Sequence, residues 1–114
     1  MLLDIKRVKI FVTVPVENLE EVRIAMCEAG AGIIGNYTYC TSSVKSQGTF
    51  MPNNDANPYI GTNNQLEIVD EEKLEIVCNV DKTKKVLDAL RKAHPYEEPA
   101  IDIFPLIDED SFNE

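Results

Sequence analysis

Apolar and polar residues alternate along the first part of the chain, and this alternation predicts a β-strand. A period of two is expected where one face of a strand is buried and the other is not. The apolar positions are Val8, Ile10, Val12 and Val14. Pro15 follows and is expected to end the strand.

The spacing then changes to that of a helix. Asn18 offers a side-chain oxygen as N-cap and Glu21 stands three residues later, which predicts a capping box with Asn in place of Ser or Thr. Apolar residues recur at helical intervals at Leu19, Val22, Ala25, Met26 and Ala29. Gly30 can adopt the left-handed conformation that closes a helix. The first unit is therefore predicted to be a strand followed by a helix.

A glycine-containing return and a second strand are expected next. The stretch 36–44, "NYTYCTSSV", is rich in the Thr, Tyr and Val that favour strands. Gly30 and Gly32 form a Gly-x-Gly that can be a plain turn or a phosphate-binding loop. A nucleotide-binding loop has its glycines between a strand and a helix, whereas these lie between a helix and a strand. The position favours the turn.

Residues 45–65 are predicted to be mostly a long polar loop, because Gly, Pro and Asn dominate them. Two short segments in this region, 48–51 and 66–69, have strand character and are expected to pair as a small hairpin. A loop of this length in a compact domain is more often functional than incidental, with simple flexibility as the alternative.

The second half of the chain repeats the pattern of the first. A third main strand is predicted by the alternation of Leu74, Ile76, Cys78 and Val80. Asp81 is expected to cap a second helix, whose apolar stripe consists of Val86, Leu87, Leu90 and Ala93.

The second helix should end at His94, because Pro95 disfavours helical geometry in the residue before it. The last strand is predicted over 100–106, with Ile101 and Ile103 on one side and Phe104 and Leu106 near the other.

These elements predict an α+β fold of the ferredoxin-like βαββαβ type, an antiparallel sheet with two helices on one face. A chain of 114 residues fits one domain, expected over 1–107, followed by an acidic tail at 108–114. The face without helices should be polar, yet Phe11, Val77 and the last strand make it apolar. An apolar face of this kind favours a homo-oligomer in which the sheets of two copies pack together. The alternative is that these are isolated apolar surface residues, which are common and need no partner.

The composition narrows the possible partners and the location. A net charge of −9 would repel phosphate backbones and anionic lipid, which argues against nucleic acid and membrane surfaces. No apolar run approaches the ~20 residues that span a bilayer. Three cysteines without Cys-x-x-Cys spacing, and charges near the N-terminus where a signal peptide would be apolar, indicate the cytoplasm. The acidic run that contains Glu71 is expected to be a solvated face, with a cation site as the alternative.

The stretch 94–99, "HPYEEP", holds the only histidine beside two carboxylates. In a structural interpretation it is a stiff turn: Pro95 stops the helix, Tyr96 packs, and Pro99 starts the last strand. In a functional interpretation, His94, Glu97 and Glu98 bind a divalent metal, and the helix end and the carboxylates favour a protonated imidazole. A closed site needs about four ligands, so a neighbouring subunit would have to contribute some of them.

Catalysis has weaker support in the sequence. A nucleophile needs a base, and Cys40, the nearest candidate thiol, is better explained as a strand residue. Glu97 and Glu98 are adjacent and would point to opposite sides of an extended chain, which does not suit joint acid–base work.

Several motifs resemble a known family. "GAGIIGNYTYC", "GTF", "ANPYIG" and "HPYEEPAIDIFPL" are similar to the small insert domain of the Nif-three-like dinuclear-metal proteins and to stand-alone versions of it. "HPYEEP" also resembles the corresponding turn of the CutA divalent-cation-tolerance proteins, and the plan is similar to that of PII signalling proteins. The resemblance implies a trimer rather than a dimer, with ligands at clefts between subunits. It implies ligand-binding roles for Asn36, Tyr37, Tyr39 and Tyr96, and a protein-contacting role for the 45–65 loop.

The chain departs from the family pattern in two ways. Ile33 and Tyr39 stand where the family usually carries histidines. The resemblance also implies that the dinuclear metal and any hydrolase-like activity belong to flanking parts, which this chain is expected to lack. The first hypothesis is therefore a non-enzymatic, PII- or CutA-like oligomer that binds a small ligand, a divalent metal or a partner protein. The alternatives are a metal-dependent hydrolase with its site at His94 and the nearby carboxylates, and a purely structural interaction module.

Overall fold

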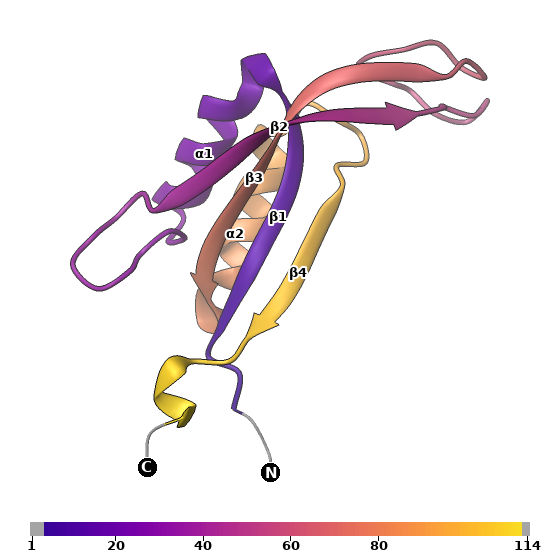
Figure 1. The fold of residues 1–114 in the computed structure, drawn as a ribbon. Coiled ribbons are helices and arrows are strands. Elements are labelled where there is room, and N and C mark those ends of the chain that lie inside the picture. The colour runs from indigo at the N-terminus through magenta and orange to yellow at the C-terminus, as the bar shows by residue number, and fades with distance from the viewer. Residues whose placement is uncertain (1–3, 113–114) are drawn as a thin grey trace.

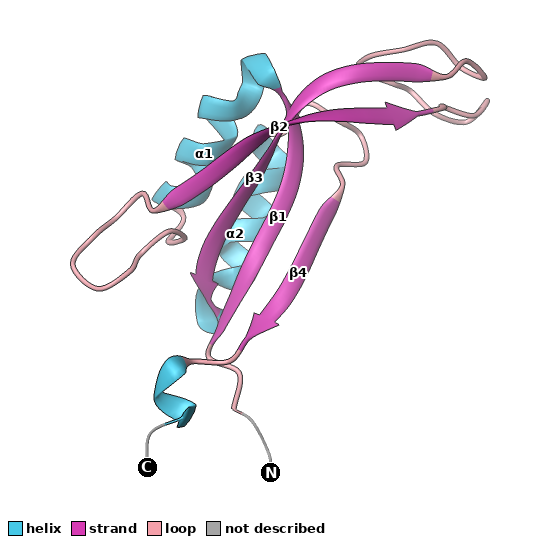
Figure 2. Ribbon diagram, in the orientation of Figure 1, coloured by secondary structure: helices cyan, strands magenta, loops and turns pink. Residues whose placement is uncertain are grey.

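The computed structural model describes residues 4–112, in which two helices cover one face of a four-stranded antiparallel sheet (Figures 1 and 2). The main elements are β1 Arg7–Pro15, α1 Leu19–Glu28, β2 Thr41–Phe50, β3 Glu67–Asn79, α2 Val80–Ala93 and β4 Ile101–Leu106. Short 3-10 turns, η1 Val16–Asn18 and η2 Glu109–Phe112, follow β1 and β4. The strand order β2-β3-β1-β4 confirms the predicted ferredoxin-like fold.

The hydrophobic core lies between the sheet and the two helices. The strand residues that the period of two predicts to be buried line it, together with residues from the helical stripes. Val80 is the exception, because it begins α2 instead of continuing β3 and is 45% exposed. Burying one such aliphatic side chain contributes about 1.5–3 kcal/mol. The fully buried members include Ile10, Val12, Val14, Val22, Met26, Leu74, Ile76, Val86 and Leu90.

The hairpin formed by β2 and β3 extends beyond the rest of the sheet. β1 pairs with β3 only as far as Pro15 opposite Glu71, whereas β2 and β3 continue to Phe50 opposite Glu67. We call residues 47–50 and 67–70 the hairpin arm, which projects from the body of the sheet (Figure 1). The expected pairing of 48–51 with 66–69 is thus present, as a continuation of the main strands. The loop at its tip spans 51–66, so 45–50 of the predicted loop are strand instead.

The strand predicted over 36–44 begins only at Thr41. The preceding residues form a turn held by an isolated bridge between Ile34 and Tyr37, and Tyr39 has a φ of 57°, which regular strands exclude. The Gly32 N–H donates to the Val77 carbonyl at 2.8 Å, so this turn is tied to β3 before β2 starts.

The sequence predicts where α2 ends more accurately than how either helix begins. Asn18 is the N-cap of α1 but its side chain caps nothing, and its Oδ1 is buried without a partner among the described residues, so the predicted capping box is wrong. Asn79, not Asp81, is the N-cap of α2. The helix stop at His94 is confirmed, since its backbone is extended with ψ of 134°.

The sheet face without helices is mixed in character rather than uniformly apolar. The Phe11 and Phe104 rings lie 5.1 Å apart between centroids, and Phe104 is 54% exposed. The Lys73 ammonium lies 5.4 Å from the Phe11 centroid, a cation–π contact. An ion pair of 3.5 Å joins Lys9 and Glu75 on the same strands. The expected apolar patch is therefore an aromatic pair bordered by charges.

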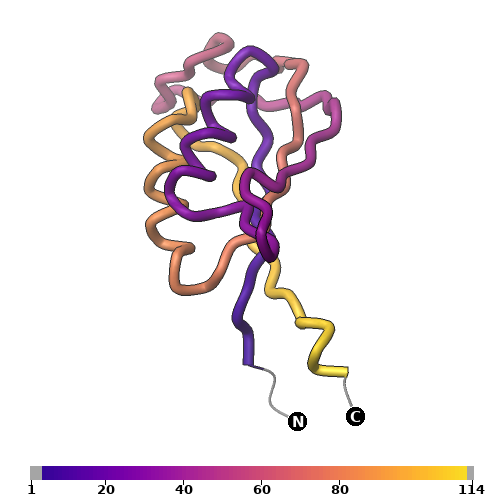
Figure 3. Tube along the Cα trace, turned by 90° about the vertical axis from the view of Figure 1, so that its left-hand side faces the viewer, coloured from indigo at the N-terminus to yellow at the C-terminus, as the bar shows by residue number. Residues whose placement is uncertain are grey.

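The start of β1 and the end of β4 lie side by side. The indigo segment at the start of β1 and the yellow segment at the end of β4 run close together in Figure 3. Arg7 is paired with Leu106 across the two strands, and the Arg7 guanidinium forms an ion pair of 2.7 Å with Asp108. The expected acidic tail therefore starts with a bonded carboxylate and a 3-10 turn, while its Glu114 lies outside the described residues. In residues 4–112, none of the helices has the length and apolar character needed to cross a membrane.

Candidate functional site

The HPYEEP turn, residues 94–99, starts where α2 ends. The His94 N–H makes the last helical bond, to the Leu90 carbonyl at 2.9 Å, and the chain then extends toward β4. β4 pairs with β1 no further than Ile101 opposite Val12. The carbonyl of Thr13, the next residue of β1, therefore lies beyond the end of β4 and needs another donor.

His94 is that donor. Its Nε2 lies 2.8 Å from the Thr13 carbonyl oxygen, and its Nδ1 accepts the Tyr96 N–H at 3.1 Å. Because a carbonyl only accepts, Nε2 carries the proton and the ring is neutral. Burial lowers the pKa of His94 below its ordinary 6.5, with the Thr13 bond and the Glu71 carboxylate opposing that shift. The expectation of a protonated imidazole is wrong, because the loss of solvent outweighs the effects of the Thr13 bond and the Glu71 carboxylate.

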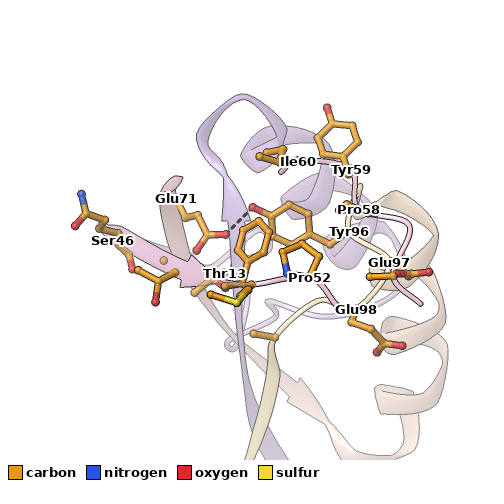
Figure 4. Close-up of a pocket in the computed structure, with 17 residues that line it drawn as sticks. Thr13, Ser46, Pro52, Pro58, Tyr59, Ile60, Glu71, Tyr96, Glu97 and Glu98 are labelled. Carbon is orange, nitrogen blue, oxygen red and sulfur yellow. Dashed lines mark hydrogen bonds between the residues drawn. The ribbon is translucent and has the colours of Figure 1, made fainter. Parts of the chain in front are cut away.

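Tyr96 joins this turn to the sheet through a buried carboxylate. Its hydroxyl donates to Glu71 Oε2 at 2.8 Å (Figure 4). Glu71 is only 5% exposed, so its prediction as part of a solvated acidic run is wrong. Burial, and then the bond to Glu71, raise the pKa of Tyr96, which keeps its hydroxyl protonated and donating.

Gly48 makes room for the Glu71 carboxylate. A Cβ on this residue of β2 would overlap with Glu71 Oε1. Glycine weakens a strand interior and often marks a close approach, which here is the approach of the carboxylate to the β2 backbone. Among the described residues no donor reaches Oε1 and no Lys, Arg or His forms an ion pair with Glu71.

A cleft of about 480 Å³ lies between the hairpin arm, the loop 51–66 and the HPYEEP turn (Figure 4). The Phe50 and Tyr59 rings lie 6.0 and 6.4 Å from the Tyr96 ring, so three aromatic side chains line it. No lysine or arginine is among the described lining residues, which include three carboxylates. A volume of this order is typical of small-molecule sites. The remaining apolar lining comes mainly from Met51, Pro52, Ala56, Pro58, Ile60 and Ala100.

Glu97 and Glu98 lie at the rim of the cleft, with their carboxylates turned away from Tyr96 (Figure 4). Glu97 accepts the Asn57 N–H at 3.1 Å, which ties the loop 51–66 to the turn. Within residues 4–112 no three His, Cys, Asp or Glu side chains converge on a point that could hold a metal ion. Metal binding by His94, Glu97 and Glu98 stays a prediction, and it would require His94 to give up one of its two hydrogen bonds.

The other predicted ligand residues lie elsewhere. Asn36, Tyr37 and Tyr39 belong to the turn before Thr41, at the opposite end of β2 from the cleft, and Tyr37 is 75% exposed. One chain does not bring them together with Tyr96. Cys40, the candidate thiol, ends the same turn, and its Sγ makes a weak contact of 3.8 Å with the Thr38 carbonyl.

Most residues of the cleft were not predicted as site residues, among them Gly48, Phe50, Tyr59 and Glu71. A glycine within a strand-forming stretch was the one available sign of a close approach at Gly48. The burial of Glu71 had no local sign, because it depends on Tyr96, 25 residues away in the sequence.

Comparisons with known proteins show which proteins this chain resembles in sequence and fold. No family model matches it. A Halalkalibacterium halodurans protein named GTP cyclohydrolase 1 type 2 homolog is 48% identical over 101 residues, which are 89% of this chain and 27% of that protein. The Bacillus subtilis protein of the same name is 46% identical, over 86% of this chain and 26% of its own length. A solved Bacillus cereus protein related to NIF3 has a TM-score of 0.78 at 43% identity, covering 90% and 26% of the two chains.

The chain is a homologue of one segment of the NIF3-related proteins. It spans only about a quarter of the relatives' length, 27% and 26% in the two sequences above. The fold of this NIF3-related segment is also that of CutA from Synechococcus elongatus, with a TM-score of 0.67 at 17% identity over 93% of this chain and 81% of that one. GlnK of B. subtilis has a TM-score of 0.59 at 12% identity, over 89% of this chain and 85% of that one. At these identities the likeness establishes the fold alone.

Proposed function

We propose that this chain is a non-enzymatic module that binds a small molecule in the cleft beside Tyr96 and assembles into a homo-oligomer. The observation that carries the proposal is the cleft itself, which is lined by three aromatic rings and a buried carboxylate. Concave, mostly apolar sites with a few convergent polar groups are the usual form of a small-molecule site. The cleft, and not the turn that contains Asn36, Tyr37 and Tyr39, is the proposed binding site.

The surroundings of the cleft favour binding over catalysis. Both ring nitrogens of His94 are engaged, one by the Thr13 carbonyl and one by the Tyr96 N–H, so the ring has no free atom to act as a base. Cys40 lies at the other end of β2. The proposed role of His94 is to fix the turn that carries Tyr96.

The proposed oligomer uses the sheet face that the helices leave open. The Phe11 and Phe104 pair lies on it, and aromatic residues are enriched where proteins associate. The resemblance to CutA and PII supports a trimer over a dimer. The loop 51–66 is the proposed contact with a partner protein. The three free cysteines, Cys27, Cys40 and Cys78, support a cytoplasmic location.

Two measurements test this proposal. Native mass spectrometry at micromolar concentration should give the mass of three chains. Amide spectra of isotope-labelled protein, screened against small molecules of positive, negative and no charge, should show shifts at Gly48, Phe50, Tyr59 and Tyr96. A monomer would refute the assembly. Shifts confined to residues 33–40, or no binding by any compound, would refute the binding site.

A further inference from the structure

We infer that the cleft binds an organic cation, whose ammonium or guanidinium group meets Glu71 and whose carbon body lies against the aromatic rings. This inference rests on the proposed function and adds the chemical class of the ligand. Three features of the cleft favour a cation: Glu71 has no cationic partner among the described residues, aromatic rings line the cleft, and the charged residues of its lining are acidic.

Glu71 is a buried carboxylate without a cationic partner. It is 5% exposed, its Oε2 accepts one bond from the Tyr96 hydroxyl, and its Oε1 has no donor among the described residues and is not sealed from solvent. His94, a titratable group whose pKa the Glu71 charge affects, is neutral and uses both nitrogens elsewhere. Buried charges are normally paired, because removal from water is otherwise costly. A cation in the cleft would supply the missing partner.

The aromatic rings suit a cation that also has an apolar body. Phe50 comes from the end of β2 and Tyr59 from the loop 51–66. Their ring centroids lie 6.0 and 6.4 Å from the centroid of the Tyr96 ring. The faces of such rings carry negative potential and attract ammonium and guanidinium groups. The same rings offer apolar surface to the carbon chain of the ligand.

The charge and the size of the cleft exclude other classes of ligand. Glu97 and Glu98 at the rim add to Glu71, and no lysine or arginine lines the described cleft, so anions such as phosphates and carboxylic acids would be repelled. A bare metal ion would lack a set of three ligands within residues 4–112. A volume of about 480 Å³ leaves room for a small organic molecule.

The test compares butylguanidinium with its neutral isostere butylurea, by calorimetric titration of the full chain at neutral pH and low salt. Butylguanidinium should bind at least about tenfold more tightly, because a charged partner strengthens a hydrogen bond to a carboxylate. Added salt should weaken this binding, and the butylurea titration should be insensitive to salt.

Matched variants locate the effect. Glu71→Gln keeps an acceptor for Tyr96 and removes the charge, and should weaken butylguanidinium binding at least about tenfold. Asp70→Asn removes the same charge from the neighbouring, exposed residue and should leave binding unchanged. If Glu71→Gln does not fold, Tyr59→Leu takes its place, with an expected loss of about two- to fivefold.

The outcomes separate this inference from the proposed function. Equal binding of butylurea and butylguanidinium at the cleft would overturn the cation inference and leave the small-molecule site intact. Failure of every charged and neutral probe to bind would overturn both. A change in oligomer mass in Glu71→Gln, without guanidinium binding in the wild type, would assign the cleft to a basic side chain of a second copy and overturn the small-cation inference.

Discussion

The imidazole of His94 donates from Nε2 to the backbone carbonyl of Thr13 across 2.8 Å, and so takes the place of a strand that has already ended. β4 stops opposite Val12, one residue short of this carbonyl. The histidine of the HPYEEP turn therefore completes the hydrogen bonding of the sheet edge, and its second nitrogen holds the Tyr96 backbone in place.

Removal of this side chain should destabilise the fold. We expect His94→Ala to lower the free energy of unfolding by about 2–3 kcal/mol, since it leaves a half-buried carbonyl without its donor and opens a cavity at the buried His94. Urea denaturation at one fixed protein concentration measures the loss. His94→Gln, which keeps an N–H donor, should recover part of it. A loss within error of zero for His94→Ala would contradict the role assigned to the ring.

Stability should also fall on mild acidification because of His94. Its pKa lies below 6.5 in the folded protein, so the unfolded chain binds more protons as the pH falls through 6.5. The stabilisation is present above 6.5 and is lost from there down to the folded pKa. The free energy of unfolding, measured from about pH 8 to about pH 5, should decline more steeply in the wild type than in His94→Gln. Parallel curves would show that another group is responsible.

Gly48 and Glu71 should behave as a coupled pair. We expect Gly48→Ala to cost about 1–3 kcal/mol, because the new methyl group overlaps with the Glu71 carboxylate. In a Glu71→Ala background the same change should cost much less, since the space is then free. Equilibrium unfolding of the four proteins gives the coupling energy. Additive costs would mean that the carboxylate moves aside without penalty.

The open face of the sheet gives a prediction about assembly. Phe104→Asp should shift the protein from trimer to monomer, because it places a charge beside Phe11 in the proposed interface. Size-exclusion chromatography with light scattering measures the mass. Ile24→Asp, at a residue of α1 that is 43% exposed, serves as the control and should keep the wild-type mass. An unchanged trimer in Phe104→Asp would locate the interface elsewhere.

The contact between Glu97 and Asn57 should limit the motion of the loop 51–66. Glu97→Ala removes the acceptor of the Asn57 N–H, whereas Glu97→Gln keeps one. We expect the amide of Asn57 to exchange with solvent about five- to tenfold faster in the alanine variant and near the wild-type rate in the glutamine variant. Hydrogen exchange followed by NMR reports both rates. Equal exchange in all three proteins would mean that other contacts fix the loop.

The fold could be predicted from the sequence because local patterns and the global plan agree. The alternation around Ile10 and Ile76 and the stop at Pro95 depend only on neighbours in sequence, and these predictions are confirmed. The errors arise where a distant contact decides. The second strand begins late because the turn before it is hydrogen-bonded to Val77, and no pattern within residues 36–44 encodes that bond.

The candidate site was predictable only in part for the same reason. Tyr96 stood out as a ligand residue because it belongs to a distinctive motif, and it does line the cleft. Glu71 looked like one carboxylate in an acidic run, and its burial depends on the hydroxyl of Tyr96 and on the missing side chain of Gly48. The buried carboxylate forms only because the fold brings Glu71, Tyr96 and Gly48 together.

The pairing of Arg7 with Leu106, and the ion pair that follows it to Asp108, has a consequence for evolution and engineering. β1 begins beside the end of β4, so the two ends of this unit lie close together. Units with adjacent ends can be inserted into a surface loop of another protein without distorting either fold. The hairpin arm, which lines the cleft, lies at the far end of the sheet from that junction (Figure 1), so the chemistry of the cleft can change without disturbing the attachment.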